Sequence, residues 1–269
     1  TSLTKQIGNV KVKVAVTDKF RSASGSVEVD ATTGSPHTAK QTPPIQLGTS
    51  GGWSKDLANG FCCGGTMGAL VSIGGVQHVL SNYHVFEADI VPGGNGIVAM
   101  TGDPIIQPGL IDVNCSASGA QNVATLVKKS SLPGSNVDCS VGKVIPGMVD
   151  SAGKILEIGT ISKTTVAAAL RQKVKKSGRT TGLTQSSVSG LNATISVTYE
   201  NECAGGTAFT QTFTGQLVVK SSASSPFISA GTSGTLMLHS LTRNPHAVRL
   251  LFASSTPPAY RPGSRHNSV

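Results

Sequence analysis

The stretch GALVSIGGVQHVLSNYHV, residues 68–85, is typical of an antiparallel β-hairpin followed by a loop. Runs rich in Val, Ile and Leu occupy residues 68–73 and 76–80, on either side of a Gly-Gly pair. Consecutive glycines favour the tight turns that join antiparallel strands, because those turns need positive φ angles. The stretch therefore predicts two paired strands, with His84 placed where the second strand ends.

Short apolar runs of the same kind recur along most of the chain, between turns rich in Gly and Pro. They are GIVAM, NVATLV, CSVGKV, ILEIGTI, ATISVTY, FTGQLVV, TLMLHS and AVRLLFAS. Many short strands with turn signals between them predict an all-β sandwich or barrel. Only residues 164–174, TTVAAALRQKV, would also suit a helix, and they would suit a strand equally well.

The ends of the chain differ in composition from its middle. The 269 residues are enough for one large β domain or two small ones. Residues 10–16, VKVKVAV, begin with the alternation of a half-buried strand, and residues 31–57 are rich in Ser, Thr, Pro and Gly. We therefore expect an N-terminal β extension and linker over residues 1–57. Residues 256–269 have no apolar period and are expected to form a loose tail.

The overall composition excludes several classes of protein. Hydrophobic residues make up 38% of the chain and charged residues 13%, which is too apolar for a disordered protein. The apolar runs are too short to span a bilayer, so we expect no membrane span. No signal peptide is recognisable in the opening residues TSLTKQIGNVKVKV, and the compartment is left open.

The formal net charge of +9 suggests either attraction to acidic partners or simple solubility. The densest basic cluster is RQKVKKSGR, residues 171–179, and no RNA- or DNA-binding signature accompanies it. Aromatic residues, at 4%, are too few to form platforms for base stacking. We therefore expect no nucleic-acid partner, and a basic β-protein that binds acidic polymers is kept as a lesser alternative.

The chain has five cysteines, which are Cys62, Cys63, Cys115, Cys139 and Cys203. No C-x-x-C pair is present, so a zinc ribbon is not expected. Adjacent cysteines are poorly placed to pair with each other, and a domain of this length does not need a disulfide framework. The cysteine count leaves the redox compartment open.

The stretch FISAGTSGTLM, residues 227–237, holds the candidate nucleophile. Ser233 stands between Thr232 and a glycine, in the sequence Gly-Thr-Ser-Gly. Gly and Ser also dominate ordinary turns, so the motif alone fits a plain turn as well as an active-site loop. The choice depends on whether the chain supplies a base, an orienting acid and a β scaffold.

His84 and Asp138 are the candidate partners of Ser233. His84 follows an apolar strand, although a histidine there is often only a surface residue. Asp138 precedes the strand CSVGKV, where an aspartate often caps a turn, and Asp112 in PGLIDVN is the rival acid. The chain order His, Asp, Ser is that of the chymotrypsin type and differs from the orders of subtilisin and the α/β-hydrolases.

The pieces LSNYHVF, NVDCSVGKV and AGTSGTLM resemble the His, Asp and Ser motifs of bacterial trypsin-like (chymotrypsin-fold) serine peptidases. The stretches CCGGTMGALV, IIQPGLIDVN and KKSGRTTGLTQSSVSG resemble a bacterial branch of that family related to the plant NARROW LEAF 1 protease. The resemblance runs from about Cys62 to Ser255, and GRTTGLT is its most specific piece.

This resemblance implies two six-stranded antiparallel β-barrels with an active site in the cleft between them. Residues 58–150 would form the first barrel, with His84 and Asp138, and residues 151–255 the second, with Ser233. The implied activity is serine endopeptidase hydrolysis of a polypeptide substrate, without metal or organic cofactor. Relatives of this branch form oligomers, which keeps a homo-oligomer in view.

In the implied mechanism, Ser233 is the nucleophile, His84 the general base and acid, and Asp138 the residue that orients His84. The backbone N–H groups of Gly231 and Ser233 would form the oxyanion hole. Phe227, six residues before the nucleophile, would lie at the base of the primary substrate pocket and favour apolar side chains. Phe227 would serve equally well as a core residue.

The sequence departs from the family pattern beside two of these residues. The usual Gly-Asp-Ser-Gly loop has Thr232 here, which implies that activation by a freed N-terminus is absent. Tyr83 stands where the branch often has a small or polar residue and would crowd His84. Both changes also fit the alternative of a catalytically weak or inactive protease-like module for binding or assembly.

Overall fold

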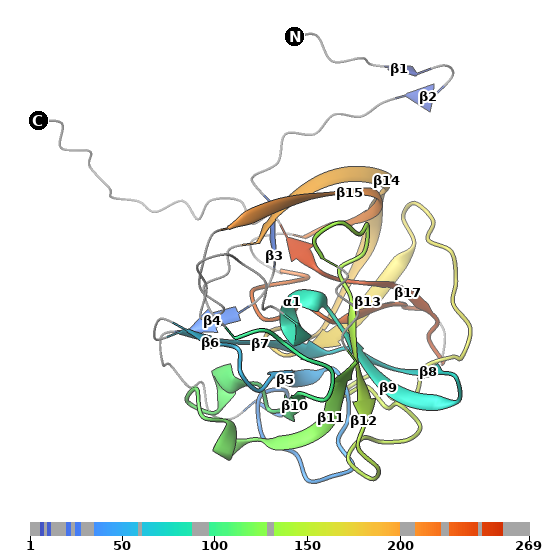
Figure 1. Cartoon of the computed structure of the whole chain (residues 1–269). Coiled ribbons are helices and arrows are strands. Elements are labelled where there is room, and N and C mark those ends of the chain that lie inside the picture. The colour runs from blue at the N-terminus through green and yellow to red at the C-terminus, as the bar shows by residue number, and fades with distance from the viewer. Residues whose placement is uncertain are drawn as a thin grey trace, which may run out of the picture.

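The fold was analysed in a computed structural model of the chain. The structure describes residues 35–58, 61–87, 97–127, 132–199, 208–221, 226–241 and 244–254, and the strands at 6–7, 10–11, 20–22 and 25–27. The described residues form two large, curled β-sheets in which most strand pairs are antiparallel, together with a separate pair of short strands and few helices (Figure 1). The structure thus confirms the predicted fold class, an all-β protein with the architecture of a chymotrypsin-like double β-barrel.

The first barrel is a sheet of nine strands in the order β4-β7-β5-β10-β11-β12-β9-β8, with β6 paired to β7. Its strands are β4 (Gly25–Val27), β5 (Thr49–Trp53), β6 (Leu57–Ala58), β7 (Phe61–Met67), β8 (Ala69–Ile73), β9 (Val76–Ser81), β10 (Pro104–Gln107), β11 (Gln121–Val127) and β12 (Ser140–Val144). The sheet has more than the six strands that the resemblance implied, because short strands such as β4 and β6 join β7.

The predicted hairpin is present as β8 and β9, which pair in antiparallel register from Ile73↔Val76 to Ala69↔Leu80. The turn consists of Gly74, with a φ of 57°, and Gly75, with a φ of 80°. Two successive positive φ angles are the requirement that a Gly-Gly pair meets without strain. The turn chemistry in the sequence therefore predicted this element correctly.

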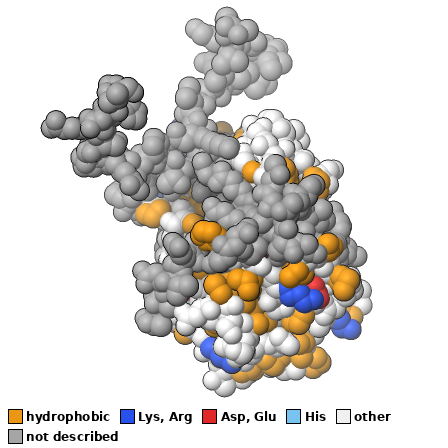
Figure 2. Space-filling view, turned by 60° about the vertical axis from the view of Figure 1, so that its left-hand side comes forward, with side chains coloured by type: hydrophobic (Ala, Val, Ile, Leu, Met, Phe, Trp, Pro, Cys, Tyr) orange, Lys and Arg blue, Asp and Glu red, His pale blue; other side chains and the backbone are white. Residues whose placement is uncertain are grey.

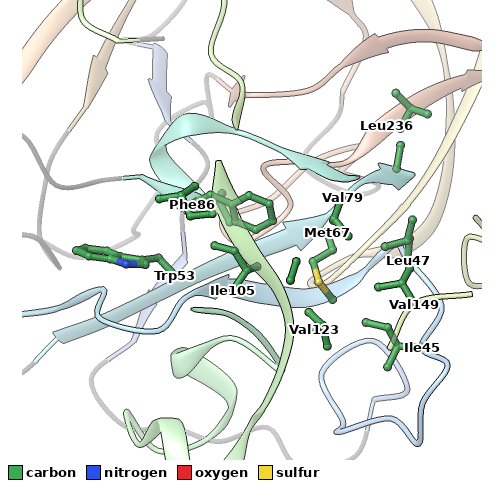
Figure 3. Packing of buried hydrophobic residues seen from close by; sticks show 14 of the residues in the cluster. Ile45, Leu47, Trp53, Met67, Val79, Phe86, Ile105, Val123, Val149 and Leu236 are labelled. Carbon is green, nitrogen blue, oxygen red and sulfur yellow. The ribbon is translucent and has the colours of Figure 1, made fainter. Parts of the chain in front are cut away.

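The core of the first barrel is built from large apolar side chains of several strands and loops. Figure 3 shows Trp53 and Phe86 at one end of this cluster and Ile45, Leu47 and Val149 at the other. Trp53, Phe86, Ile45 and Leu47 are all fully buried. Burial of such apolar surface is the main favourable contribution to folding, so residues that precede position 58 belong to the barrel core.

The expected linker is therefore part of the first barrel over its described residues, and the predicted start of that barrel at residue 58 is too late. Strand β5 lies between β7 and β10 in the sheet. Its small residues permit close strand contact: a Cβ added at Gly51 would lie 2.5 Å from Met67 Cγ. The glycine-rich composition of this stretch suggested a loop, although here it reflects tight packing between neighbouring strands.

The second barrel is a sheet of seven strands in the order β17-β16-β13-β14-β3-β18, with β15 paired to β14. Its strands are β3 (Phe20–Ser22), β13 (Lys173–Gly178), β14 (Gly182–Tyr199), β15 (Phe209–Val219), β16 (Leu236–His239), β17 (Ala247–Leu250) and β18 (Ala253–Ser254). β14 and β15 form a long ribbon along one edge of the molecule (Figure 1). The chain passes from the second sheet to the first between β3 and β4, and it returns to the second sheet between β12 and β13.

The predictions for the ends and the ambiguous segments have mixed outcomes. β1 (Gln6–Ile7) and β2 (Val10–Lys11) pair with each other, and the rest of VKVKVAV and the predicted tail lie outside the described residues. The ambiguous stretch TTVAAALRQKV is mainly a loop, joined to β17 by one bridge from Thr165, and becomes strand only at β13. GIVAM and ILEIGTI are not strands over their described residues.

A disulfide joins Cys62 in β7 to Cys115, which follows the 3-10 helix η1 (Leu110–Asp112). Cys63 is also disulfide-bonded, whereas Cys139 is not part of a disulfide. The part of the chain that the structure describes contains no group of three or more His, Cys, Asp or Glu residues that could hold a metal ion. Nor does a helix long and apolar enough to cross a membrane occur among the described residues.

Candidate active site

His84 and Asp138 come together because of the pairing of the strands that carry them. β9 and β12 are antiparallel, with Ser81 opposite Ser140, so the residues after β9 lie beside those before β12. β9 leads into the single helical turn α1 (Tyr83–Phe86), which carries His84. His84 Nδ1 lies 2.6 Å from Asp138 Oδ2, and both side chains are buried. The short distance identifies a strong, charge-assisted contact.

The carboxylate of Asp138 receives two further hydrogen bonds. The backbone N–H of Tyr83 donates to Oδ1 at 2.7 Å, and the Tyr199 hydroxyl donates to Oδ2 at 2.8 Å. Asn82 Nδ2 donates to the backbone carbonyl of Asp138 at 2.7 Å, which holds the same residue from its main chain. Buried polar oxygens need such donors, so these contacts hold the carboxylate of Asp138 in one position behind His84.

Tyr199, near the end of β14, is a site residue that the sequence analysis missed. Its ring stacks on Phe209 at a centroid distance of 5.0 Å and lies 5.7 Å from the ring of His84. Burial, with the charge and hydrogen bond of Asp138, raises the pKa of Tyr199 far above its ordinary value. The phenol therefore stays protonated and acts only as a donor to Asp138. Nothing in the strand pattern around Tyr199 marks it as a polar contact.

The two ring nitrogens of His84 differ in their contacts with the described residues. Nε2 is buried and makes no hydrogen bond to any described residue. In a neutral histidine, donation from Nδ1 to a carboxylate leaves Nε2 as the acceptor. An unsatisfied buried acceptor is costly, and it calls for an explanation such as a catalytic role. Among the described residues, His84 thus has one ring nitrogen in contact with Asp138 and a second one that no donor contacts.

Ser233 lies on the loop that precedes β16 and is fully buried. Its Oγ donates to the carbonyl oxygen of Phe252 at 3.4 Å and not to His84 Nε2. The loop and α1 both press against Gly65 of β7: a Cβ added there would lie 2.6 Å from Val85 Cγ2 and 3.0 Å from the Ser233 carbonyl oxygen. The structure therefore brings Ser233 to the side of β7 that carries α1, without a direct hydrogen bond between serine and histidine.

The backbone amides of Gly231 and Ser233 donate no hydrogen bond within the described residues. Gly231 has a φ of 83°, a conformation that glycine adopts without strain. Thr232 between them is fully buried and closes the turn, because its N–H donates to the Ser229 carbonyl at 3.0 Å and its Oγ1 accepts from the Ser229 N–H at 3.2 Å. Thr232 thus stabilises the loop locally, without an ion pair.

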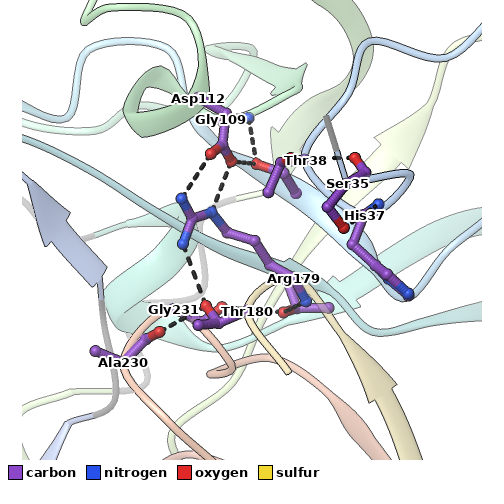
Figure 4. A network of polar contacts seen from close by, with 11 residues as sticks. Ser35, His37, Thr38, Gly109, Asp112, Arg179, Thr180, Ala230 and Gly231 are labelled. Carbon is purple, nitrogen blue, oxygen red and sulfur yellow. Dashed lines mark hydrogen bonds and ion pairs between the residues drawn. The ribbon is translucent and has the colours of Figure 1, made fainter. Parts of the chain in front are cut away.

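Asp112, the rival acid, is engaged elsewhere. Both of its carboxylate oxygens accept from the Arg179 guanidinium at 2.6 Å, and Oδ2 also accepts from Ser50 (Figure 4). The thiol of Cys139 is no rival nucleophile either. Burial, reinforced by the charges of Asp138 and Glu87, raises its pKa above the ordinary thiol value. Of the candidate acids, only Asp138 contacts His84.

Phe227 is almost fully buried in a hydrophobic cluster with Val174, Val188 and Met237. Its carbonyl oxygen accepts from Thr184 Oγ1 at 3.0 Å. The ammonium group of Lys176 lies 6.0 Å from the centre of the Phe227 ring. Burial lowers the pKa of Lys176 to about 7, although attraction to Glu157 acts against this shift. Phe227 is thus a core residue in this structure, and its role in a substrate pocket stays a prediction.

The side chain of Tyr83 packs between the barrels, and its predicted crowding of His84 stays a prediction. It lies in a buried cluster with Leu132, Val197, Tyr199 and Phe213. Arg249, the charged residue in AVRLLFAS, lies in β17 and donates to the Gly215 carbonyl at 3.0 Å. The contact between His84 and Asp138 is present with Tyr83 beside it.

No family model and no curated protein matches the chain. Among solved structures, a glutamic acid-specific serine protease is 13% identical, with a TM-score of 0.45, covering 78% of this chain and 90% of that chain. Thermobifida fusca protease A is 19% identical, with a TM-score of 0.41, covering 76% and 80%. Cellulomonas bogoriensis chymotrypsin is 20% identical, with a TM-score of 0.37, covering 68% and 71%. The branch related to NARROW LEAF 1 stays a prediction.

Proposed function

We propose that this protein is a serine endopeptidase that hydrolyses peptide bonds through an acyl-enzyme on Ser233. The observation that carries the proposal is the buried pair of His84 and Asp138, 2.6 Å apart, with His84 Nε2 left without a partner. An imidazole fixed by a carboxylate, with a free acceptor nitrogen, is the arrangement that a hydroxyl nucleophile requires.

In the proposed reaction, His84 Nε2 takes the proton of Ser233 Oγ while Oγ attacks the carbonyl carbon of the substrate. The tetrahedral intermediate collapses when His84 gives that proton to the leaving amine, and the acyl group remains on Ser233. A water molecule then attacks the ester with His84 again as base, which releases the acid and restores the serine. Asp138 keeps Nδ1 protonated and stabilises the imidazolium.

The amides of Gly231 and Ser233 would donate to the oxyanion of each tetrahedral intermediate. Their lack of a partner within the described residues supports this role. Loss of one such donor typically lowers the rate about 10²–10³-fold. Ser233 Oγ must first leave the Phe252 carbonyl and rotate about Cα–Cβ toward His84. Catalytic hydrogen bonds are often long or misaligned in the absence of substrate.

One observation favours a second candidate, an inactive protease-like binding module. Ser233 is fully buried, and its hydroxyl is turned to Phe252 rather than to His84. If this arrangement persisted with substrate, the serine would not be activated. A polyanion-binding role has less support, because the Lys and Arg side chains visible on the face in Figure 2 stand apart from one another.

We also propose that Phe227 contributes an apolar wall to the primary pocket, so that apolar side chains are preferred before the cleaved bond. Its ring belongs to a buried apolar cluster, which supports this preference. Profiling with a library of peptide substrates would check it. A preference for Lys or Arg at that position would contradict the proposed role of Phe227.

The experiment that tests the activity is labelling with a fluorophosphonate, followed by intact-mass measurement. We expect one adduct on the wild type and none on Ser233→Ala or His84→Ala. Ser229→Ala is the matched control, since it changes a serine of the same loop outside the proposed triad. No adduct on well-folded wild type, at long times and several pH values, would refute the peptidase proposal. Labelling of Thr232→Asp alone would then identify Thr232 as the cause.

A further inference from the structure

The carbonyl oxygens of the loop around Ser233 are each held by a hydrogen bond. Thr180 Oγ1 donates to the Ala230 carbonyl at 2.6 Å, and Thr66 Oγ1 donates to the Gly231 carbonyl at 3.1 Å. The Ser233 carbonyl accepts from the Thr66 N–H at 2.8 Å. The carbonyls of this loop therefore point toward protein donors, which has a consequence for the amides that follow them.

In a planar trans peptide, the C=O of one residue and the N–H of the next point in opposite directions. The bond from Thr180 to the Ala230 carbonyl thus fixes the direction of the Gly231 N–H. That N–H is one of the two donors proposed for the oxyanion hole. Glycine tolerates widely different backbone angles, so the sequence of the loop alone does not hold this peptide in one orientation.

Thr180 is itself held by a chain of polar contacts that Figure 4 shows. Arg179 Nη1 donates to Thr180 Oγ1 at 3.2 Å, so the hydroxyl accepts from Arg179 and its hydrogen is left for the Ala230 carbonyl. The same guanidinium is held by Asp112 through Nε and Nη2, each at 2.6 Å. A bidentate pair of this kind fixes the plane of the guanidinium as well as its position.

The contacts also leave no room for a side chain on Gly231. A Cβ added there would lie 2.5 Å from Thr180 Oγ1 and 2.6 Å from Arg179 Nη1. The Arg179 N–H donates to Thr66 Oγ1 at 3.0 Å, so the hydroxyl that holds the Gly231 carbonyl is oriented by Arg179 too. Asp112 and Thr66 belong to the first barrel and Arg179 to the second, so the loop is held from both sides.

We propose that Thr180, oriented by the Asp112–Arg179 pair, is a positioning residue that fixes the Ala230–Gly231 peptide with its N–H toward the oxyanion. This inference rests on the proposed peptidase function. Without the Thr180 hydroxyl, the Ala230 carbonyl loses its donor and the peptide is free to turn over. The turned peptide would present a carbonyl oxygen, in place of an N–H, to the developing negative charge.

The test compares Thr180→Val, which keeps the shape of the side chain and removes the donor, with Thr180→Ser, which keeps the donor. Thr180 is exposed, so neither change is expected to prevent folding. We expect kcat for a peptide substrate to fall about 10²-fold in Thr180→Val with KM nearly unchanged. The Ser variant should recover most of the rate, and binding of a peptide aldehyde should weaken in parallel with kcat/KM.

A crystal structure of Thr180→Val supplies a readout that does not depend on activity. A turned or mobile Ala230–Gly231 peptide supports the inference, even if the wild type proves inactive and the peptidase proposal fails. A peptide that keeps its orientation overturns the inference. So does a kcat within about twofold of an active wild type, or a change confined to KM.

Discussion

Asp56 carries the clearest prediction for stability. The residue is 1% exposed, and its Oδ1 has no hydrogen-bond partner. Burial disfavours the charged carboxylate and raises its pKa from the ordinary value of 3.8 to about 8. Between these two values, the native state keeps a proton that the unfolded state has lost. The contribution of Asp56 to the free energy of unfolding therefore falls as the pH rises from about 4 to 8 and is flat above that range.

The magnitude follows from the width of this interval. A pH of 7 is roughly three units above the pKa of this carboxyl in the unfolded state, and each unit corresponds to about 1.4 kcal/mol. Asp56 therefore destabilises the native state at pH 7 by on the order of 4 kcal/mol, as an upper limit. Asp56→Asn cannot ionise, so we expect it to stabilise the protein at pH 7 and to make little difference near pH 4.

Urea unfolding followed by tryptophan fluorescence is the suitable assay. Trp53 is the only tryptophan of the chain, and its carbonyl accepts from the Asp56 N–H, so the probe lies beside the change. The difference in unfolding free energy between variant and wild type should grow steadily from pH 4 to 8. A constant difference over this range would refute the reasoning, because it would mean that Asp56 ionises alike in both states.

Three further predictions concern other buried polar groups. Asp103→Asn should show the opposite trend to Asp56→Asn. Burial raises the pKa of Asp103, but hydrogen bonds from Lys55, Met100 and Trp53 lower it overall, so the carboxylate stabilises the native state above about pH 4 and this stabilisation is lost as the pH falls. A difference in urea midpoint between variant and wild type that does not change with pH would contradict this. Lys176 should make the free energy of unfolding of the wild type rise from pH 7 to about 10, because the native ammonium loses its proton near pH 7 and the unfolded one near pH 10.5. Lys176→Met should not show this rise. An equal rise in both proteins would exclude Lys176 as the cause. Tyr199→Phe should lower the free energy of unfolding by about 1.5–3 kcal/mol, since Asp138 loses a hydrogen-bond donor. Urea unfolding that matches the wild type would show that the hydrogen bond from Tyr199 to Asp138 does not stabilise the protein.

The sequence predicted those features that depend on local chemistry. The Gly-Gly turn needs positive φ angles and therefore marked the hairpin of β8 and β9. The sequence also identified the end of the strand before His84 and the start of the strand after Asp138. Because these two strands pair, His84 and Asp138 come into contact. The chain order of His, Asp and Ser then restricted the choice of fold.

Features that depend on distant contacts could not be predicted in this way. Tyr199 contacts an aspartate 61 residues away, and an aromatic residue in an apolar strand gives no sign of a polar partner. β5 was predicted as part of a linker because it lies in a stretch rich in Gly and Ser. In the structure, Gly51 allows close contact with Met67 because it has no side chain. The direction of the Ser233 hydroxyl depends on the Phe252 carbonyl, which only the folded chain brings near.

Thr66 links the order of folding to the onset of the proposed activity. Its hydroxyl donates to the Gly231 carbonyl across 165 residues of sequence. Contacts of such long range require closure of a large loop and tend to form slowly, since the entropy of closure must be overcome first. A nascent chain that ends before residue 231 holds His84 and Asp138 but lacks Ser233, the proposed nucleophile. Labelling at Ser233 should therefore appear only with the slowest phase of refolding, when the two barrels have docked, so that a growing chain has little opportunity to cleave itself or its neighbours.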